Sequence, residues 1–238
     1  MISVCMATYN GERYLRRQVE SILAQLADGD ELIVSDDGST DGTLELLESL
    51  ADPRLRIMHN SGRHGVNANF DNALRHAGGD YIFLSDQDDV WLPGKVQVCI
   101  EQLQEADCVV HDAIVIDSDN SVLCHSFFDS RGSGPGFWKN LYKNTYLGCC
   151  MAFRREVCAK ALPIPVTKCF YQDNWIGSIA DASFRLRFIP FKGIRFQRHT
   201  DSASTTARHS RLSFAAQLRN RLVQLLLVTS RLIRSEAK

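Results

Sequence analysis

The chain has 238 residues, which is enough for one large α/β domain or two small ones. Apolar residues make up 45% of it and charged residues 23%, a balance typical of globular proteins. The formal net charge is −1, so the composition gives no sign of a general affinity for nucleic acid. The sequence has no run of 18 or more apolar residues, and we therefore expect no membrane-spanning helix.

Eight cysteines are spread along the chain, at positions 5, 99, 108, 124, 149, 150, 158 and 169. They form no Cys-X-X-Cys pair and no cysteine–histidine zinc spacing, and the first residues lack the pattern of a secretory leader. Most lie in apolar stretches such as VQVCI and ADCVV. We therefore expect reduced core cysteines in a cytoplasmic protein.

The first 105 residues alternate between short apolar runs and amphipathic segments. Strands are expected over 2–7, at the start of 31–43, over 55–60 and within 80–89, and helices over 12–26, 43–50, 68–79 and 93–105. This alternation predicts a doubly wound, mostly parallel sheet with right-handed crossovers. Ligands bind at the carboxyl ends of such strands, so the polar loops 7–11, 35–41 and 85–91 are expected to face one crevice.

The pattern is less regular after residue 105. A strand and hairpin are expected over 106–124, a mobile Gly/Ser-rich loop over 129–137, a helix over 172–182 and two short strands around 185–197. The tail 208–234 combines leucines with six arginines. This pattern fits either a basic amphipathic helix on an anionic membrane leaflet or a helix packed on the domain or in a dimer.

The segment LSDQDDVW at 84–91 places three aspartates in four positions directly after an apolar run. Carboxylates at the exit of a buried strand suit Mg²⁺ or Mn²⁺, although Asp88 and Asp89 would also fit an acidic turn that caps the next helix. The EF-hand, P-loop and GxGxxG patterns are absent from the sequence. A second Asp-X-Asp, in DSDN at 117–120, has the residues of a hairpin turn.

Three stretches resemble, in order and spacing, the family-2 glycosyltransferases, which have the GT-A nucleotide-sugar-binding fold: SVCMATYNGERYLRRQVESILAQ, ELIVSDDGSTDGT and GGDYIFLSDQDDVW. SDQDDVW, with YQDNWIGSIA and FQRH later, is most similar to the bacterial rhamnosyltransferase branch, which makes surface polysaccharides such as the lipopolysaccharide core and O-antigen. The resemblance implies one α/β GT-A domain at 1–207 with a mostly parallel central sheet. Its nucleotide-sugar-binding half would be 1–105 and its acceptor and catalytic half 106–207, followed by the helical tail 208–238.

The resemblance assigns the nucleobase to the loops after the first two strands. Thr8 and Tyr9 would contact the base. Asp37, beside Asp36, would accept a hydrogen bond from the N3–H of uracil or thymine, an imide that a carboxylate suits. Taken without the resemblance, the two aspartates also fit loop and cap chemistry before the next helix.

The same resemblance assigns a divalent cation, Mg²⁺ or Mn²⁺, to the acidic segment. Asp88 would be its principal ligand and Asp86 would contact the ribose or share the metal, whereas Asp89 has no assigned role. His199 would complete the metal shell and Arg198 would pair with phosphate, although an ordinary surface histidine is an equally good interpretation of His199.

Asp173, in YQDNWIGSIA, matches the aspartate that acts as general base in the family, with Gln172 in place of the usual Glu or His. Asp173 would also fit a plain helix cap. In NTYLGCCMAF, Gly148 would permit close approach of the backbone to the sugar.

These implications predict an inverting, metal-dependent transferase that moves a sugar, rhamnose above all, from dTDP-L-rhamnose or a UDP-sugar to a saccharide or lipid-linked acceptor. Two alternatives stay open. A sugar-1-phosphate nucleotidyltransferase would need a basic Gly-rich loop, which ATYNGERYL matches poorly. A non-catalytic nucleotide-sugar-binding subunit would not need both Asp88 and Asp173. The expected location is cytoplasmic, with peripheral contact to the inner membrane if the tail docks there.

Overall fold

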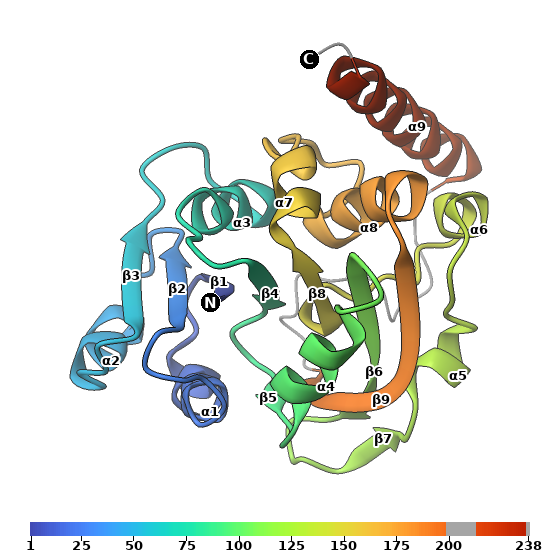
Figure 1. Cartoon of the computed structure of the whole chain (residues 1–238). Helices are drawn as coiled ribbons and strands as arrows, with labels where there is room; N and C mark the ends of the chain where they lie inside the picture. Colours follow the sequence, from blue (N-terminus) through green and yellow to red (C-terminus); the bar gives the residue numbers. More distant parts are fainter. Residues whose placement is uncertain (199–212, 237–238) are drawn as a thin grey trace.

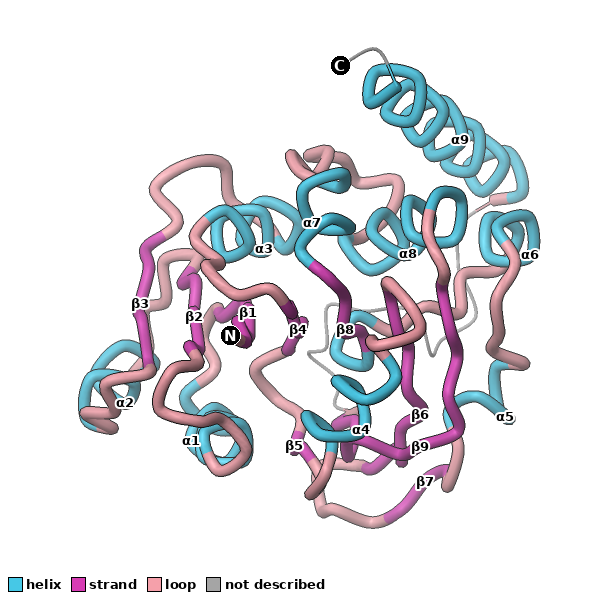
Figure 2. The backbone as a smooth tube through the Cα atoms, viewed as in Figure 1, coloured by secondary structure: helices cyan, strands magenta, loops and turns pink. Residues whose placement is uncertain are grey.

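The computed structural model describes residues 1–198 and 213–236. Figure 1 shows one curled β-sheet with helices packed on its faces, and Figure 2 shows the same path by element type. The last helix, α9 (Phe214–Glu236), lies at the periphery of the molecule. The architecture is of the α/β class that the sequence predicts.

The first half forms four neighbouring parallel strands. They are β1 (Ile2–Thr8), β2 (Glu31–Asp36), β3 (Leu55–His59) and β4 (Tyr81–Ser85), accompanied by helices α1 (Glu12–Leu23), α2 (Thr43–Ser49), α3 (Val66–Arg75) and α4 (Lys95–Gln102). Their order in the sheet is β3-β2-β1-β4, and all three pairs are parallel. Because parallel strands end at one edge, the loops after β1, β2 and β4 lie side by side, which confirms the expectation of a shared crevice.

The second half completes the same sheet with strands of mixed direction. They are β5 (Val90–Trp91), β6 (Cys108–Ile116), β7 (Val122–Cys124), β8 (Met151–Arg154) and β9 (Leu186–Gln197), and the sheet continues β4-β8-β6-β9-β5, with β7 beside β6. β8 is antiparallel to β4 and β6, whereas β6 and β9 are parallel. One continuous sheet therefore joins the two halves.

The prediction of two short strands around 185–197 was wrong. β9 is a single strand of 12 residues whose register against β6 shifts on either side of Asp112. Such a bulge bends a strand, and Figure 1 shows β9 curving beneath α4. Beyond the bend β9 pairs with β5, directly after the acidic segment. The bend therefore brings the end of β9 to the carboxyl edge of β4.

The predicted hairpin is present as β6 and β7. In its turn, Oδ1 of Asp117 accepts hydrogen bonds from the N–H groups of Asp119 and Ser121, both at 2.9 Å. The second Asp-X-Asp is therefore a turn, as expected. The segment 129–137, expected to be one loop, contains the end of α5 (Phe127–Arg131) and the start of α6 (Phe137–Tyr142).

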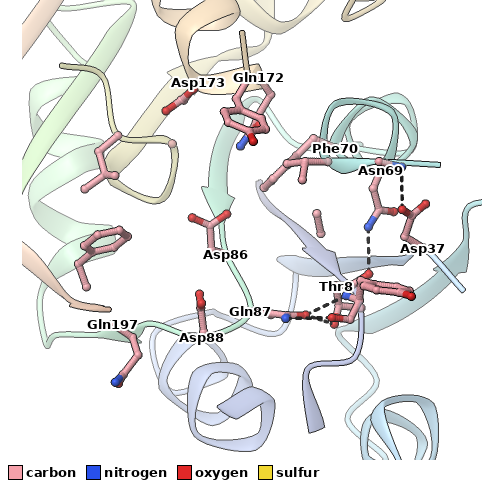
Figure 3. A pocket seen from close by; sticks show the side chains of 18 residues that line it. Thr8, Asp37, Asn69, Phe70, Asp86, Gln87, Asp88, Gln172, Asp173 and Gln197 are labelled. Atoms are coloured by element: carbon pink, nitrogen blue, oxygen red, sulfur yellow. Dashed lines mark hydrogen bonds between the residues drawn. The ribbon is translucent and has the colours of Figure 1, made fainter. Parts of the chain in front are cut away.

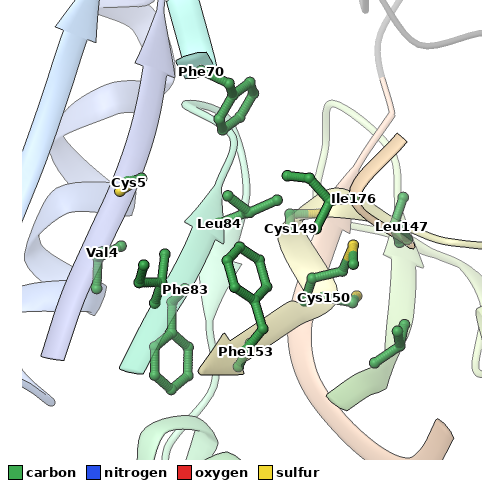
Figure 4. Packing of buried hydrophobic residues seen from close by; sticks show 14 of the residues in the cluster. Val4, Cys5, Phe70, Phe83, Leu84, Leu147, Cys149, Cys150, Phe153 and Ile176 are labelled. Atoms are coloured by element: carbon green, nitrogen blue, oxygen red, sulfur yellow. The ribbon is translucent and has the colours of Figure 1, made fainter. Parts of the chain in front are cut away.

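Three further elements pack beside β8 and β4. They are the short 3₁₀ helix η1 (Gly148–Cys150), α7 (Arg155–Ala161) and α8 (Gln172–Ser183). Figure 4 shows the apolar layer beneath the carboxyl ends, in which Leu84 of β4 lies near Cys149 of η1 and Ile176 of α8. All eight cysteines are free and six are buried, in agreement with the expectation of core cysteines.

The tail packs on the domain through one face of α9. The side chains of Gln224 and Val228 are buried, and Gln224 donates hydrogen bonds to Asn174 and Ser178 of α8. The opposite face exposes five apolar side chains, namely Phe214, Leu218, Leu222, Leu226 and Ile233. Among the helices of residues 1–198 and 213–236, none combines the length and apolarity needed to cross a bilayer.

Candidate active site

A cavity of about 440 Å³ opens at the carboxyl ends of β1 and β4. Figure 3 shows its walls, to which the loop after β2, α3, η1, the start of α8 and the end of β9 also contribute. Seven of the predicted site residues line it: Thr8, Tyr9, Asp37, Asp86, Asp88, Gly148 and Asp173. The fold therefore assembles at one place residues that are up to 165 positions apart in the sequence.

Asp37 is a rigidly held carboxylate at one end of the cavity. Its Oδ2 accepts a hydrogen bond from the N–H of Gly65 at 2.7 Å, and its Oδ1 accepts one from Nδ2 of Asn60 at 2.7 Å. His64 Nδ1 lies 3.1 Å from the same Oδ1. A carboxylate has about four acceptor positions, so Asp37 retains capacity for a donor from a ligand.

Asp36 is placed differently from its neighbour and does not line the cavity. It is buried, and its carboxylate accepts hydrogen bonds from the N–H groups of Gly38 and Ser39 and from Ser39 Oγ. Asp36 thus organises the loop that presents Asp37, which is the loop chemistry that the sequence left open.

Gln87 connects the first loop to the acidic segment. Its Oε1 accepts hydrogen bonds from Thr8 Oγ1 at 2.7 Å and from the N–H of Tyr9 at 2.8 Å, and its Nε2 donates to the carbonyl of Tyr9. A side chain on Gly11 would clash, because its Cβ would lie 2.5 Å from Gln87 Oε1. Sequence reasoning missed Gln87, although its position between Asp86 and Asp88 was a usable signal.

The acidic segment concentrates negative charge at the floor of the cavity. Burial, followed by the charges of Asp88 and Asp173, raises the pKa of Asp86 to about 7. Asp89 lies below, fully buried, where burial and the charge of Asp88 raise its pKa. Its Oδ1 accepts a hydrogen bond from the N–H of Gln197 at 2.9 Å, whereas its Oδ2 has no hydrogen-bond partner.

The donor set of this segment fits a hard divalent cation. Asp86 and Asp88 both line the cavity, and the charge of Asp88 adds to the effect of burial in raising the pKa of Asp86. A second grouping, Asp86 with Asp89 and Cys149, has ligand atoms within 4.8 Å of one another. Asp89 and Cys149 are buried beneath the cavity, and a thiol is a poor ligand for Mg²⁺, so Asp86 and Asp88 are the better pair. His199 lies outside the described residues.

Asp173 faces the acidic segment from the first turn of α8 (Figure 3). Its side chain is only 7% exposed, and burial raises its pKa to about 6 although hydrogen bonds from the N–H of Asn174 and the Asn144 side chain oppose the shift. Gly148 packs against it, because a Cβ there would lie 3.3 Å from the Asp173 Cβ. A carboxylate with this pKa is ionised near neutral pH and still basic enough to take a proton.

The end of β9 brings Gln197 to the cavity wall, whereas Arg198 is not among the lining residues. Gln197 is anchored by its N–H to Asp89 and by its Oε1, which accepts a hydrogen bond from Arg17. The N–H of Arg198 donates to the carbonyl of Ile116 at 2.8 Å. The β-bulge in β6 and β9 decides this placement, and the local sequence carried no signal of it.

Solved structures share this architecture. The TarS fragment 1–349 of S. aureus in complex with UDP-GlcNAc superposes with a TM-score of 0.70 at 18% identity, over 94% of this chain and 66% of that one. The mannosyltransferase PcManGT of Pyrobaculum calidifontis, in complex with GDP-Man and Mn²⁺, gives a TM-score of 0.61 at 20% identity, over 98% and 64%. These likenesses confirm the predicted GT-A fold.

The sequence comparisons point to the same group of proteins. An uncharacterized glycosyltransferase of Nostoc sp. is 29% identical over 90% of this chain and 71% of its own length. A UDP-glucose:α-D-GlcNAc-diphosphoundecaprenol β-1,3-glucosyltransferase of Escherichia coli is 26% identical over 63% of this chain and 58% of its own length. Neither name specifies rhamnose, so the similarity to the rhamnosyltransferase branch stays a prediction. The family model described as glycosyl transferase family 2 matches residues 3–162, and the chain therefore belongs to that family.

Proposed function

We propose that the protein transfers a sugar, with inversion, from a nucleoside diphosphate sugar to a hydroxyl group of a saccharide or lipid-linked acceptor. The observation that carries the proposal is that Asp37, the Asp86–Asp88 pair and Asp173 line one cavity. They supply an acceptor for a nucleobase, ligands for a cation and a base for the acceptor hydroxyl.

Asp37 and Tyr9 recognise the nucleobase in this proposal. The held carboxylate of Asp37 accepts the N3–H of uracil or thymine, and the exposed ring of Tyr9 offers a face for stacking. Both pyrimidines share this imide, so UDP-sugars and dTDP-L-rhamnose fit equally. The UDP-GlcNAc bound by the TarS fragment supports the uridine class.

Asp86 and Asp88 hold a Mg²⁺ or Mn²⁺ ion in the proposal, as the carboxylate pair suits. When bound, the cation supplies positive charge beside the diphosphate as it leaves. The Mn²⁺ in the complex of the Pyrobaculum mannosyltransferase supports this choice.

Asp173 is the general base. It takes the proton of the acceptor hydroxyl while that oxygen bonds to the anomeric carbon and the bond from that carbon to the diphosphate oxygen breaks on the opposite face. Burial keeps bulk water from Asp173 and so favours proton transfer from the acceptor.

The acceptor is proposed to be lipid-linked and the pathway bacterial polysaccharide or lipopolysaccharide synthesis. The diphosphoundecaprenol acceptor in the name of the E. coli relative supports this. We further propose that α9 rests on an anionic leaflet. Its exposed apolar face is flanked by Arg219 and Arg234, and α6 beside it exposes Trp138 and Tyr142.

The decisive test is Asp173→Asn, assayed for hydrolysis and transfer with UDP-glucose, UDP-galactose, UDP-N-acetylhexosamines and dTDP-L-rhamnose in Mn²⁺. We expect kcat to fall by about 10²–10⁴, the usual contribution of a general base, with the Kd of the donor unchanged. The matched control is Asp119→Asn in the second, hairpin Asp-X-Asp, which should keep full activity. Full activity of the Asp173 variant, or activity that EDTA leaves intact, would overturn the corresponding assignment.

A further inference from the structure

Lys95, the first residue of α4, is a buried cation in an unfavourable position. Its side chain is fully buried, which favours the neutral amine. A positive charge at a helix N-terminus also opposes the helix dipole. Because both effects destabilise the ammonium form, we expect a hydrogen-bond acceptor or a negative charge near the Lys95 side chain.

The partners of Lys95 are a backbone carbonyl of η1 and the aromatic ring of Trp91 in β5. Its Nζ donates a hydrogen bond to the backbone carbonyl of Cys149 at 2.8 Å and lies 3.8 Å from the centroid of the Trp91 ring. The negative charge of Asp89 favours the ammonium form, and the ammonium charge in turn acts on Asp86. Lys95 is thus a positive charge on the protein side of the carboxylates, opposite to the cavity.

The η1 turn that accepts this hydrogen bond joins the two sides of the site. Sγ of Cys149 and one carboxylate oxygen each of Asp86 and Asp89 lie within 4.8 Å of one another. One residue earlier, Gly148 packs against Asp173. A displacement of η1 would therefore move Asp86 and Asp173 relative to each other.

Asp89 is a carboxylate whose charge acts on Lys95. It is fully buried, and its Oδ2 has no hydrogen-bond partner. A buried carboxylate in that state is costly unless a positive charge lies within reach. Lys95 is a cation that interacts electrostatically with Asp89, and screening is weak in the protein interior.

We propose that Lys95 is a positioning residue that offsets the buried charge of Asp89 and holds the η1 turn, so that Asp86 and Asp173 face one cavity. The inference rests on the proposed function in so far as Asp173 is the base. Lys95 touches neither donor nor acceptor in this role, since it lies below the cavity floor.

A double-mutant cycle tests the charge relation without any assay of turnover. Lys95→Met keeps most of the length of the side chain but removes its charge, and we expect the Tm to fall by about 5–10 °C. In Lys95→Met/Asp89→Asn the Tm should be higher than the sum of the two single shifts predicts, because the uncompensated carboxylate is gone. Lys160→Met, which removes another lysine lying over an aromatic ring, should leave the Tm within about 2 °C. Additive single shifts would overturn the proposal.

Separate measurements of kcat and of the Kd of the donor test the positioning role. We expect Lys95→Met to lower kcat at least about tenfold while the Kd of the nucleotide donor, measured by calorimetry, changes less than about threefold. Lys95→Gln, which retains a donor for the Cys149 carbonyl, should lose less kcat than Lys95→Met. Wild-type kcat in Lys95→Met would overturn the role, as would equal losses in both variants. If the wild-type protein turns over no donor, the proposed function fails while the stability cycle still decides the relation of Lys95 to Asp89.

Discussion

At the scale of a single residue, the protonation state of Asp173 is subject to two opposing requirements. In its proposed role as general base, Asp173 must be ionised to accept a proton, yet burial raises its pKa to about 6. Below that pH the protonated form predominates, and a neutral carboxyl group is too weakly basic to take the acceptor proton. The environment of the residue therefore sets the acid limb of the reaction.

We expect kcat/KM to rise about tenfold per pH unit up to about pH 6 and then to level off. The profile would be recorded from about pH 5 to pH 8 at constant free Mn²⁺. The hairpin variant Asp119→Asn should reproduce it. An activity that is flat over this range would show that Asp173 does not titrate in catalysis.

At the scale of an element, one arginine of α9 forms hydrogen bonds with the end of α7 and the residues that follow it. Arg231 Nη1 donates to the carbonyls of Lys160, Ala161 and Leu162 at 2.7–3.0 Å, and its Nη2 donates to that of Pro163 at 2.7 Å. The carbonyls of residues 160–162 belong to the end of α7, where they lack partners inside the helix. Arg231 is thus a C-terminal cap supplied by a residue about 70 positions away.

Arg231→Met should lower the free energy of unfolding by about 2–3 kcal/mol, because methionine retains part of the apolar stem but leaves several carbonyls unpaired. For a chain of this size that corresponds to a Tm lower by about 4–12 °C. Arg234→Met, which changes an exposed arginine on the same helix, should have a shift below about 2 °C. Equal shifts for the two variants would contradict the capping role.

At the scale of the whole molecule, the outer face of α9 is an apolar surface that the described residues leave uncovered. Leu226 is 69% exposed, Phe214 75% and Trp138, on the neighbouring α6, 70%. Isolated exposed leucines are common, but a row of them along one helix flanked by arginines is typical of a helix that lies in a membrane interface.

We expect the protein to float with vesicles that contain about 30% anionic phosphatidylglycerol and to be released by 0.5 M salt, since part of the attraction is electrostatic. Leu222→Glu/Leu226→Glu should reduce the bound fraction at least about fivefold. Thr229→Glu, on the same exposed side, would add one charge without removing a leucine and should have a smaller effect. A stable dimer in light scattering, abolished by the double variant and without vesicle binding, would show instead that a second copy of the chain covers this face.

The sequence by itself determined the parts that depend on local pattern. Alternating apolar runs and amphipathic segments predicted the parallel strands, and the common direction of those strands predicted that three polar loops lie at one edge. The acidic cluster in LSDQDDVW, together with the resemblance of that segment and of YQDNWIGSIA to family-2 motifs, singled out Asp86, Asp88 and Asp173, all of which line the cavity.

Only the tertiary structure decided which polar groups reach that cavity and which support it from below. Successive residues at the end of a strand point in different directions, so Asp37 enters the cavity while Asp36 turns back into its loop. The bulge that bends β9 delivers Gln197, and the hydrogen bond from Lys95 to the Cys149 carbonyl joins α4 to η1. These contacts join residues 54 to 108 positions apart. Local periodicity carries no information about such separations, because they are set by how strands and helices pack.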